Sequence, residues 1–517
     1  MNFRLLLFSL SIFLVSCVNT GRNKNLKIFK YNEVSEVNTL DPAFSKDQAS
    51  VWVCNQMYNG LVQLDSNLRV IPSIAKGWEI LDSGLTYKFL LRNDVYFHNH
   101  KVFLNKEQRR VKASDFEYSF NRLIDERVAS PGSWVLNNVD SFYAVNDSMF
   151  FIKLIKPFPA FLQMLSMQYC SVVSKKNFNK ENKDFIGTGP FKFQFWKRGV
   201  KLVLRKNIDY FEKDDKNQSL PYLDAISISF IRDKQTAFLR FLQGEIDFIS
   251  GIDASYKDEV LTRDGKLQDS YKDKIKLSTS YYLNTEYLGF YMNDSIPLKV
   301  RKAINLGFDR KKMIKYLRNN IGTPALNGFV PPGMPSFSNK VKGYEYNPEL
   351  AKELLEKSDF DNEITLSTTS SYLDLCEYIQ NELSKIGLKI KIDVNPPSTH
   401  RQMVATSKLS FFRGSWIADY PEAENYLSLF YSKYHSPNGP NYTHFVNKEF
   451  DSMYEKSFTV LNDSSRYLLF QKMDQLIIDS AVIVPLYYDY IVRLINPQIN
   501  GFENNPMNLI HLKRTKK

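Results

Sequence analysis

Cysteine is scarce in this chain, whose 517 residues include only four. Cys17 belongs to an N-terminal signal discussed below, and Cys54, Cys170 and Cys376 leave at least one thiol unpaired. No CxxC pair occurs, so neither a disulfide framework nor a zinc site is indicated. Long apolar runs are also missing, since the longest covers residues 5–15. That run is too short to span a bilayer, which excludes a protein with several membrane spans.

Sequence motifs of several enzyme classes are absent too, namely HExxH, a Walker loop, GxSxG and GxGxxG. The glycines of segment 187–190 lack the lysine and the following helix of a phosphate cradle, so we interpret the segment as a turn. His98 and His100 have no third ligand nearby, and we interpret them as part of a surface loop rather than a metal site. The sequence indicates neither an enzyme nor a cofactor.

What is present is an ordinary globular composition, with 43% hydrophobic and 24% charged residues. The length favours two or three domains. The 73 aromatic residues are numerous, and packing explains them better than a ligand cavity does. The net charge is +12, but the basic residues alternate with acids except in segments 106–112 and 513–517. We interpret this as solvated surface and expect no nucleic-acid partner.

The N-terminus resembles a bacterial lipoprotein signal. Arg4 precedes the apolar stretch, small Ser16 would admit the peptidase, and Cys17 would become the lipid-bearing first residue. We therefore predict a signal peptide over residues 1–16 and a lipid-anchored tether over 17–25. The alternative is a plain secretory signal that contains a cysteine. The anchored form would lie outside the cytoplasm, in the periplasm or at the cell surface.

The pattern of apolar residues predicts several elements. Residues 27–31 indicate a strand, 114–125 a helix with a capping box of Ser114 and Glu117, and Asn347 with Pro348 the start of another helix. Residues 363–368 indicate a strand, a helical stripe follows and stops at Gly387, and 388–394 alternate as a second strand. A strand, a helix and a strand in this order form a βαβ unit, so we predict an α/β fold with a parallel or mixed sheet.

One short segment, 413–422, combines several chemistries. In a cleft, Asp419 would pair with an α-ammonium group, Arg413 with a carboxylate or a bridging water, and Trp416 would form an apolar wall. The backbone of the strand through Ser415 and Ile417 would hydrogen-bond a peptide backbone. The alternative is a core tryptophan beside a surface ion pair. These residues alone do not decide between the two.

The surrounding chain resembles a known family. From about residue 26 onward it is similar to the extracytoplasmic solute-binding proteins of ABC importers, specifically the oligopeptide- and dipeptide-binding family. The similar segments follow the family's order: 38–42, 55–61, 72–79, 91–98, 111–116, 187–191, 207–211, 244–247, 300–305, 308–310 and 484–488.

This resemblance implies a bilobal α/β fold, with a two-strand hinge and an additional inserted domain. Carried over to this chain, lobe I comprises residues 26–45, 180–278 and 487–517, the inserted domain 46–179, and lobe II 279–486. The hinge crossings would fall near Tyr281 and Tyr487.

The resemblance also implies a peptide site. Asp419 matches the residue that binds the peptide's α-ammonium group, and Trp416 with Ser415 and Ile417 matches one wall. Glu36 and Val37 match the opposite backbone ladder. Tyr487 matches a site position on the hinge, and Arg413 matches a position that helps to balance a ligand carboxylate. Segment 420–422 departs from the commoner sequences of the family, which leaves the preferred peptide length open.

We therefore expect a monomeric, lipid-anchored receptor that binds short peptides and works with the permease and ATPase subunits of an ABC importer. We expect it to need neither a cofactor nor a metal. A first alternative keeps the fold but changes the ligand to glutathione, a nickel chelate, haem or an oligosaccharide. Others are a lipoprotein enzyme with an unrecognised site, and a scaffold or chaperone without a small ligand.

Overall fold

The computed structural model describes residues 26–178, 185–253, 255–294 and 296–517. The predicted signal peptide, Cys17 and the tether lie outside the described residues. Among those that are described, no helix has the length and apolar character needed to span a bilayer.

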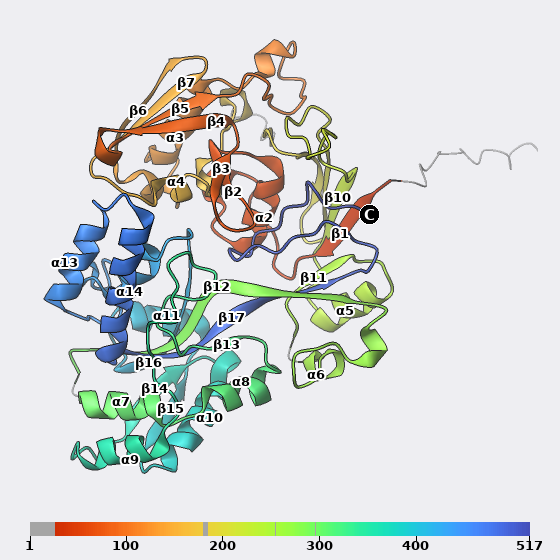
Figure 1. Ribbon diagram of the computed structural model, residues 1–517. Helices are drawn as coiled ribbons and strands as arrows, with labels where there is room; N and C mark the ends of the chain where they lie inside the picture. Colours follow the sequence, from red (N-terminus) through yellow and green to blue (C-terminus); the bar gives the residue numbers. More distant parts are fainter. Residues whose placement is uncertain (1–25, 179–184, 254, 295) are drawn as a thin grey trace, which may run out of the picture.

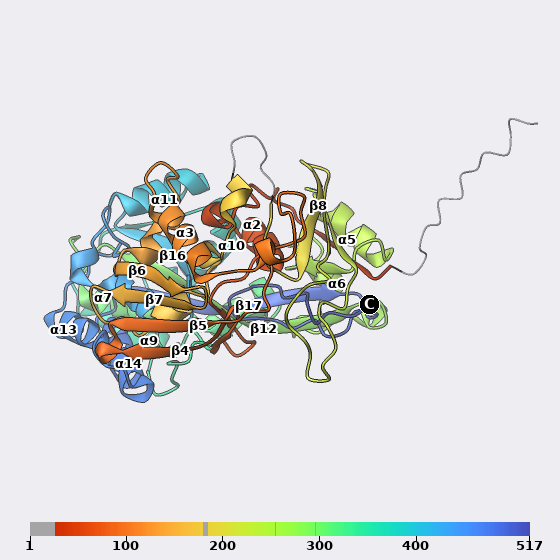
Figure 2. The ribbon, with the colours of Figure 1, turned by 90° about the horizontal axis from the view of Figure 1, so that it is seen from above.

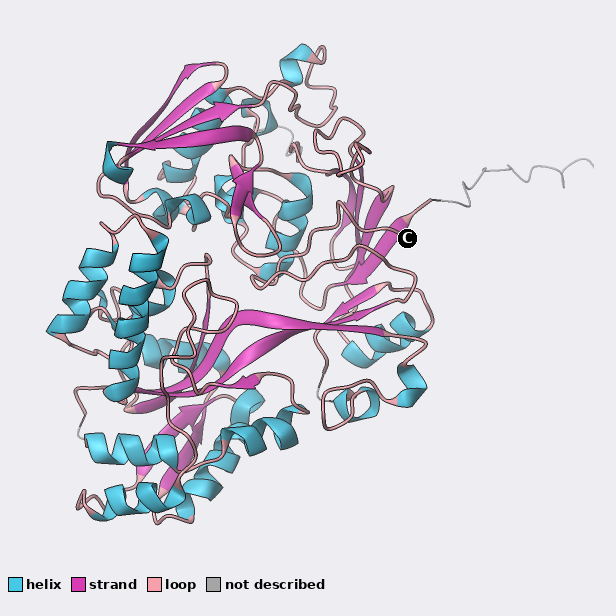
Figure 3. Cartoon of the chain, viewed as in Figure 1, coloured by secondary structure: helices cyan, strands magenta, loops and turns pink. Residues whose placement is uncertain are grey.

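One large mixed sheet links most of the chain, in the strand order β15-β14-β16-β12-β17-β11-β1-β10-β9-β8. We call the part built on β11, β1, β10, β9 and β8 lobe I, and the part built on β15, β14 and β16 lobe II. Helices cover the sheet of lobe II on both faces, as the α/β prediction requires (Figures 1 and 3).

The strands are β1 Ile28–Asn32, β2 Val62–Leu64, β3 Val70–Pro72, β4 Ala75–Leu81, β5 Thr86–Leu91, β6 Val139–Asn146, β7 Met149–Leu154, β8 Phe191–Lys197, β9 Lys201–Lys206, β10 Ala225–Ser229, β11 Phe248–Ser250, β12 Lys276–Phe290, β13 Thr323–Pro324, β14 Ile364–Thr368, β15 Ile390–Val394, β16 Phe411–Ile417 and β17 Ile483–Ile495.

The α-helices are α2 Gln48–Met57, α3 Ala113–Ile124, α4 Phe161–Met164, α5 Lys234–Leu242, α6 Lys257–Val260, α7 Leu298–Leu306, α8 Arg310–Arg318, α9 Pro348–Glu356, α10 Leu373–Ser384, α11 Pro397–Ala405, α12 Glu424–Leu427, α13 Lys448–Ser457 and α14 Asp463–Asp479.

Strands β12 and β17 connect the two lobes. They pair antiparallel from Lys276 opposite Ile495 to Gly289 opposite Ile483, with interruptions, and run side by side through the middle of the molecule in both views (Figures 1 and 2). The register shifts between Tyr281 and Thr285, opposite Tyr490 and Tyr488. Such an irregularity bends a strand pair. The two-strand hinge expected from the resemblance is therefore present, and its bend lies where the lobes meet.

The predicted βαβ unit is confirmed in lobe II. β14 and β15 pair in parallel, with α10 between them in sequence. The predicted strand near 27–31 is β1, and α9 begins at Pro348 with Asn347 as its N-cap. These elements follow local signals that tertiary packing does not override.

A four-stranded antiparallel sheet, β4-β5-β7-β6, and the β2-β3 pair stand apart from the large sheet (Figure 3). The helix predicted in this region is present as α3, but the prediction of Ser114 and Glu117 as its capping box is wrong. The N-cap is Lys112, whose backbone N–H donates to the Asp115 carboxylate at 2.8 Å, and Ser114 lies inside the helix.

The interpretation of His98 as a surface residue is also wrong. His98 is buried, and its ring contacts the N–H of Gly187 at 3.1 Å and the carbonyl of Gly189 at 3.0 Å. A Cβ atom added to Gly187 would lie 1.9 Å from the carbonyl oxygen of Met57. Segment 187–190 is therefore a tight crossing of two backbones, which glycine allows because it has no side chain.

Candidate functional site

Strand β16 has an unpaired edge on lobe II. Its pairing with β14 covers only Phe411 and Phe412. On the other side β12 pairs along all of β16, and the bonds from Ala418 N–H to Leu283 and from Tyr291 N–H to Ser410 show that the even-numbered residues face β12. By alternation, the backbone groups of Ser415 and Ile417 point to the unpaired edge. No described strand occupies that edge.

Asp419 lies just beyond this edge and is held by Asn425. The Asn425 side chain accepts from the indole N–H of Trp416 at 3.0 Å and from the backbone N–H of Asp419 at 3.2 Å. Its Nδ2 donates to the Asp419 carboxylate at 3.2 Å. Because Asn425 is buried, these bonds fix the indole and the carboxylate relative to the strand.

The Asp419 carboxylate has no ion-pair partner among the described residues, although Asn425 donates to it. The side chain reaches solvent, yet protein atoms crowd it and remove part of its hydration, which raises the pKa of Asp419 above its usual value. Its charge in turn contributes to the raised pKa of Tyr169, for which burial is the larger cause. Asp419 therefore lies near enough to Tyr169 for its charge to act there, and no cation pairs with it among the described residues.

A second carboxylate, Glu424, lies behind Asp419 but is fully used. It accepts from the hydroxyls of Tyr420, at 2.5 Å, and of Tyr454. Burial raises the pKa of Glu424, and the charge of Asp419 adds to this. Glu424 is part of the packed support of the site rather than a free ligand for a cation.

Arg413, further back on β16, is already paired. Its guanidinium donates to Glu286, and the side chains of the two residues are only 13% and 3% exposed. The guanidinium carbon lies 3.3 Å from the ring centroid of Tyr372. Glu286 also accepts from Ser415 Oγ at 2.9 Å and from Asn284 Nδ2 at 3.2 Å. The pair is thus enclosed by further hydrogen bonds.

Tyr487 lies on the hinge strand β17, next to Glu286 in the register. Its ring is buried and is covered by the guanidinium of Arg318 at 4.5 Å from the ring centroid. Arg318 in turn forms an ion pair with Asp489 at 3.1 Å. A second arginine of lobe II is therefore also matched by a carboxylate.

Glu36 and Val37 lie on lobe I, after the end of β1. The Val37 side chain is fully buried in the core of that lobe, and the Glu36 carboxylate accepts from the N–H of Gly199 at 2.8 Å. Neither side chain contacts the residues of β16. A role for Glu36 and Val37 in ligand binding would therefore use their backbone groups, and it stays a prediction.

The structure brings together Trp416 and Asp419 through Asn425, and Arg413 and Ser415 through Glu286. Ile417 is exposed at the free edge. Sequence reasoning missed Asn425 and Glu286. A signal for Glu286 existed, since Asn284, Thr285 and Glu286 interrupt an apolar strand, whereas no local pattern singles out Asn425.

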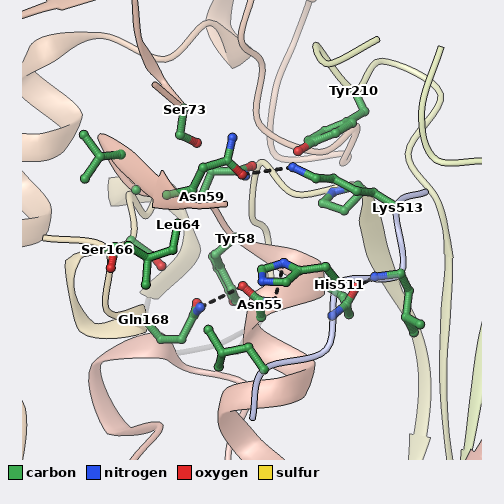
Figure 4. Close-up of a pocket in the computed structure, with 18 residues that line it drawn as sticks. Asn55, Tyr58, Asn59, Leu64, Ser73, Ser166, Gln168, Tyr210, His511 and Lys513 are labelled. Carbon is green, nitrogen blue, oxygen red and sulfur yellow. Dashed lines mark hydrogen bonds between the residues drawn. The ribbon is translucent and has the colours of Figure 1, made fainter. Parts of the chain in front are cut away.

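A separate polar cavity lies between α2, the β2-β3 pair and the C-terminal segment (Figure 4). Its volume is about 50 Å³, far less than a ligand pocket needs. The hydroxyl of Ser73 and Nε2 of His511 are buried there without a hydrogen-bond partner among the described residues. Such a cavity has room for water, but not for a peptide. No group of metal-ligating side chains occurs in the described part of the chain.

Comparison with known proteins identifies a family and several relatives. The chain matches the family described as bacterial extracellular solute-binding proteins, family 5 (middle), over residues 69–438. It is 24% identical to the dipeptide-binding protein DppE of Bacillus subtilis, covering 94% of this chain and 91% of that one. It is 26% identical to the heme-binding protein A of Haemophilus influenzae, covering 87% and 85%.

Among solved structures, the chain is similar to the ABC transporter-associated periplasmic binding protein DppA of Helicobacter pylori in complex with the peptide STSA. The TM-score is 0.75 and the identity 26%, over 94% of this chain and 98% of that one.

Proposed function

This chain belongs to family 5 of the bacterial extracellular solute-binding proteins, the receptors of ABC importers, and from this we propose that it binds short peptides between its lobes. Closure about β12 and β17 would enclose the peptide, and the closed form would deliver it to the permease, whose ATPase subunits supply the energy. The proposal deals with one of several ligand classes, since relatives are named for dipeptides, haem and glutathione.

The observation that carries the proposal is the free edge of β16 ending at an unpaired carboxylate. An extended peptide placed on this edge would bond to the backbone of Ser415 and Ile417, as in β-strand addition. Running antiparallel to β16, it would bring its α-ammonium group to Asp419. Haem has no ammonium group, so Asp419 favours a peptide over haem.

Main-chain bonds and one terminal charge do not depend on the peptide's side chains. Affinity would then tolerate many sequences, with side chains directed alternately to either side of the added strand. Trp416, locked by Asn425, would supply an apolar contact beside the first residue of the ligand.

The test is a four-member cycle in calorimetry: the wild-type protein and Asp419→Asn, each with a free tripeptide and its N-acetyl form. Removing one partner of a desolvated pair costs about 3–5 kcal/mol, or roughly two to three and a half decades in affinity. Each single change should have this effect, and the two together should cost little more than one.

Full additivity in this cycle, or wild-type affinity for the acetylated peptide, would contradict the assignment of Asp419. Retained binding of glutathione by Asp419→Asn would point instead to a ligand held at another place in the cleft.

We also propose that Cys17 carries the lipid anchor. Cys17→Ser should yield a folded protein that no longer sediments with membranes, while its peptide affinity is unchanged. A membrane-bound Cys17→Ser protein would refute the anchor without affecting the ligand assignment.

A further inference from the structure

On the surface of lobe II that would receive the ligand, the acidic and the basic side chains differ in whether a side chain of opposite charge pairs with them. The Asp419 carboxylate has no cation beside it among the described residues. A peptide extending from Asp419 along the free edge heads toward Arg413, gaining about 3.3 Å per residue. Its carboxyl end would therefore come toward the arginines of the lobe, and the partners of those arginines decide whether that end is recognised.

The charge of Arg413 is already compensated by a carboxylate of the protein, although its Nε is buried without a hydrogen-bond partner among the described residues. Its guanidinium is bonded to Glu286 and stacked on Tyr372, and its carbonyl oxygen accepts from His400 at 2.8 Å. A ligand carboxylate could replace Glu286 only by leaving that side chain, which is 3% exposed, without its cation. Because stranding a buried charge is unfavourable, the exchange is disfavoured.

Arg318 is occupied in the same way. It bonds to Asp489 at 3.1 Å and lies on the ring of Tyr487. Both residues of this ion pair are partly buried, so the charge of Arg318 is likewise compensated by a carboxylate of the protein before any ligand binds.

Arg493, on the lobe I end of β17, is enclosed as well. Its guanidinium lies over the rings of Trp52 and Phe248, at 5.1 and 5.2 Å from their centroids, and donates to Ser250 and Asn508. The side chain is almost fully buried in the core of lobe I. It does not offer its charge to the surface.

From these contacts we infer that the site recognises the amino end of a peptide and leaves the carboxyl end unrecognised. Its substrate class then includes peptides whose carboxyl end is amidated or extended by further residues, provided the amino end is free. This inference rests on the proposed peptide binding and adds what the peptide's other end contributes.

The experiment compares tetra-alanine with free ends, its C-terminal amide and its N-acetyl form in calorimetry. For the wild-type protein, the amide should bind within about threefold of the free acid, whereas acetylation should weaken binding by about 100-fold or more. An amide that binds at least about tenfold more weakly than the acid would overturn the inference.

Two variants sharpen the comparison. Glu286→Gln keeps the shape of the side chain but frees the charge of Arg413, so a preference for the acid over the amide, of about tenfold, should appear. Arg413→Gln removes the charge and should leave the ratio of acid to amide at its wild-type value. Should Glu286→Gln fail to fold, Arg413→Gln decides alone: loss of a wild-type acid preference in this variant would overturn the inference.

Asp489→Asn is the matched control on the second arginine. It frees Arg318, which lies over Tyr487 on β17, a strand separated from β16 by β12, and the same gain of acid preference would show that Asp489 masks it. Failure of the proposed function gives a different pattern, because tetra-alanine would then not bind, or its acetylated form would bind as well as the free one.

Discussion

Asp419 and Arg413 belong to the same short stretch of chain, and the protein surrounds their charges in different ways. Arg413 has a carboxylate, an aromatic ring and neighbouring hydrogen bonds, while Asp419 has one amide donor and a neighbouring carboxylate that two tyrosines already use. In the free protein the charge of Arg413 is therefore compensated, although its buried Nε has no hydrogen-bond partner among the described residues. Asp419 pairs with no cation in the same described part of the chain, which is the property expected of a place that a cationic group enters.

The largest difference between the two positions should appear in the free energy of unfolding of variants at Glu286 and at Asp419. Glu286→Ala leaves the guanidinium of Arg413 buried and unpaired, and should destabilise lobe II by about 3–5 kcal/mol. Asp419→Ala removes a charge that pairs with no cation among the described residues and should cost less than about 1 kcal/mol. Urea unfolding of the two variants without ligand gives the comparison. The double variant Glu286→Gln/Arg413→Met should recover much of the loss, because no buried charge is stranded; equal losses for Glu286→Ala and Asp419→Ala would contradict the contrast.

A smaller effect is expected at Asn425. Asn425→Ala removes three hydrogen bonds, one of them to the Asp419 carboxylate, and should weaken binding of a free peptide by about tenfold or more. Binding of the N-acetyl peptide should hardly change, since it does not use the carboxylate. Calorimetry with both peptides distinguishes positioning from general damage, because a loosened fold would weaken both peptides equally.

The smallest expected effect is the pH dependence of peptide affinity and of stability at Asp419. Protein atoms around the solvent-exposed Asp419 carboxylate remove part of its hydration and raise its pKa, so the carboxylate is neutralised at a higher pH than an ordinary aspartate, and affinity for a free peptide should fall as the pH drops through that raised pKa. In the ligand-free protein the sign for stability is opposite. The folded state binds the proton more tightly, so the Asp419 contribution to stability is lost as the pH rises from about 3.9, the usual aspartate pKa, to the raised one.

Asp419→Asn removes both dependences and serves as the control. A wild-type affinity that stays constant, or increases, as the solution is acidified through this range would contradict the role of the carboxylate.

Much of the fold follows from local signals in the sequence. Strict alternation in residues 388–394, the stop at Gly387 and the N-cap at Asn347 each specify an element within a few residues, because the physical causes are local. The capping box of α3 was misplaced because Lys112 uses its backbone N–H, which any residue offers, so no residue type marks the position.

The site is less accessible to sequence reasoning. Trp416, Asp419 and Arg413 are close in sequence, and their chemistry indicated a ligand or an ion pair. Whether these residues bind a ligand or form an ion pair depends on Glu286, which lies on a strand distant in sequence, and on Asn425, whose role needs the turn after β16. His98 was assigned to the surface because its partners, Gly187 and Gly189, are also distant in sequence.

A crystal structure of the protein with the amide of tetra-alanine tests the central claim most directly. The account predicts the peptide amino group within hydrogen-bond distance of the Asp419 carboxylate, main-chain bonds to Ser415 and Ile417, and the Arg413–Glu286 ion pair intact. The free acid should lie in the same place. A ligand carboxylate bonded to Arg413 with Glu286 displaced, or an amino group remote from Asp419, would contradict it.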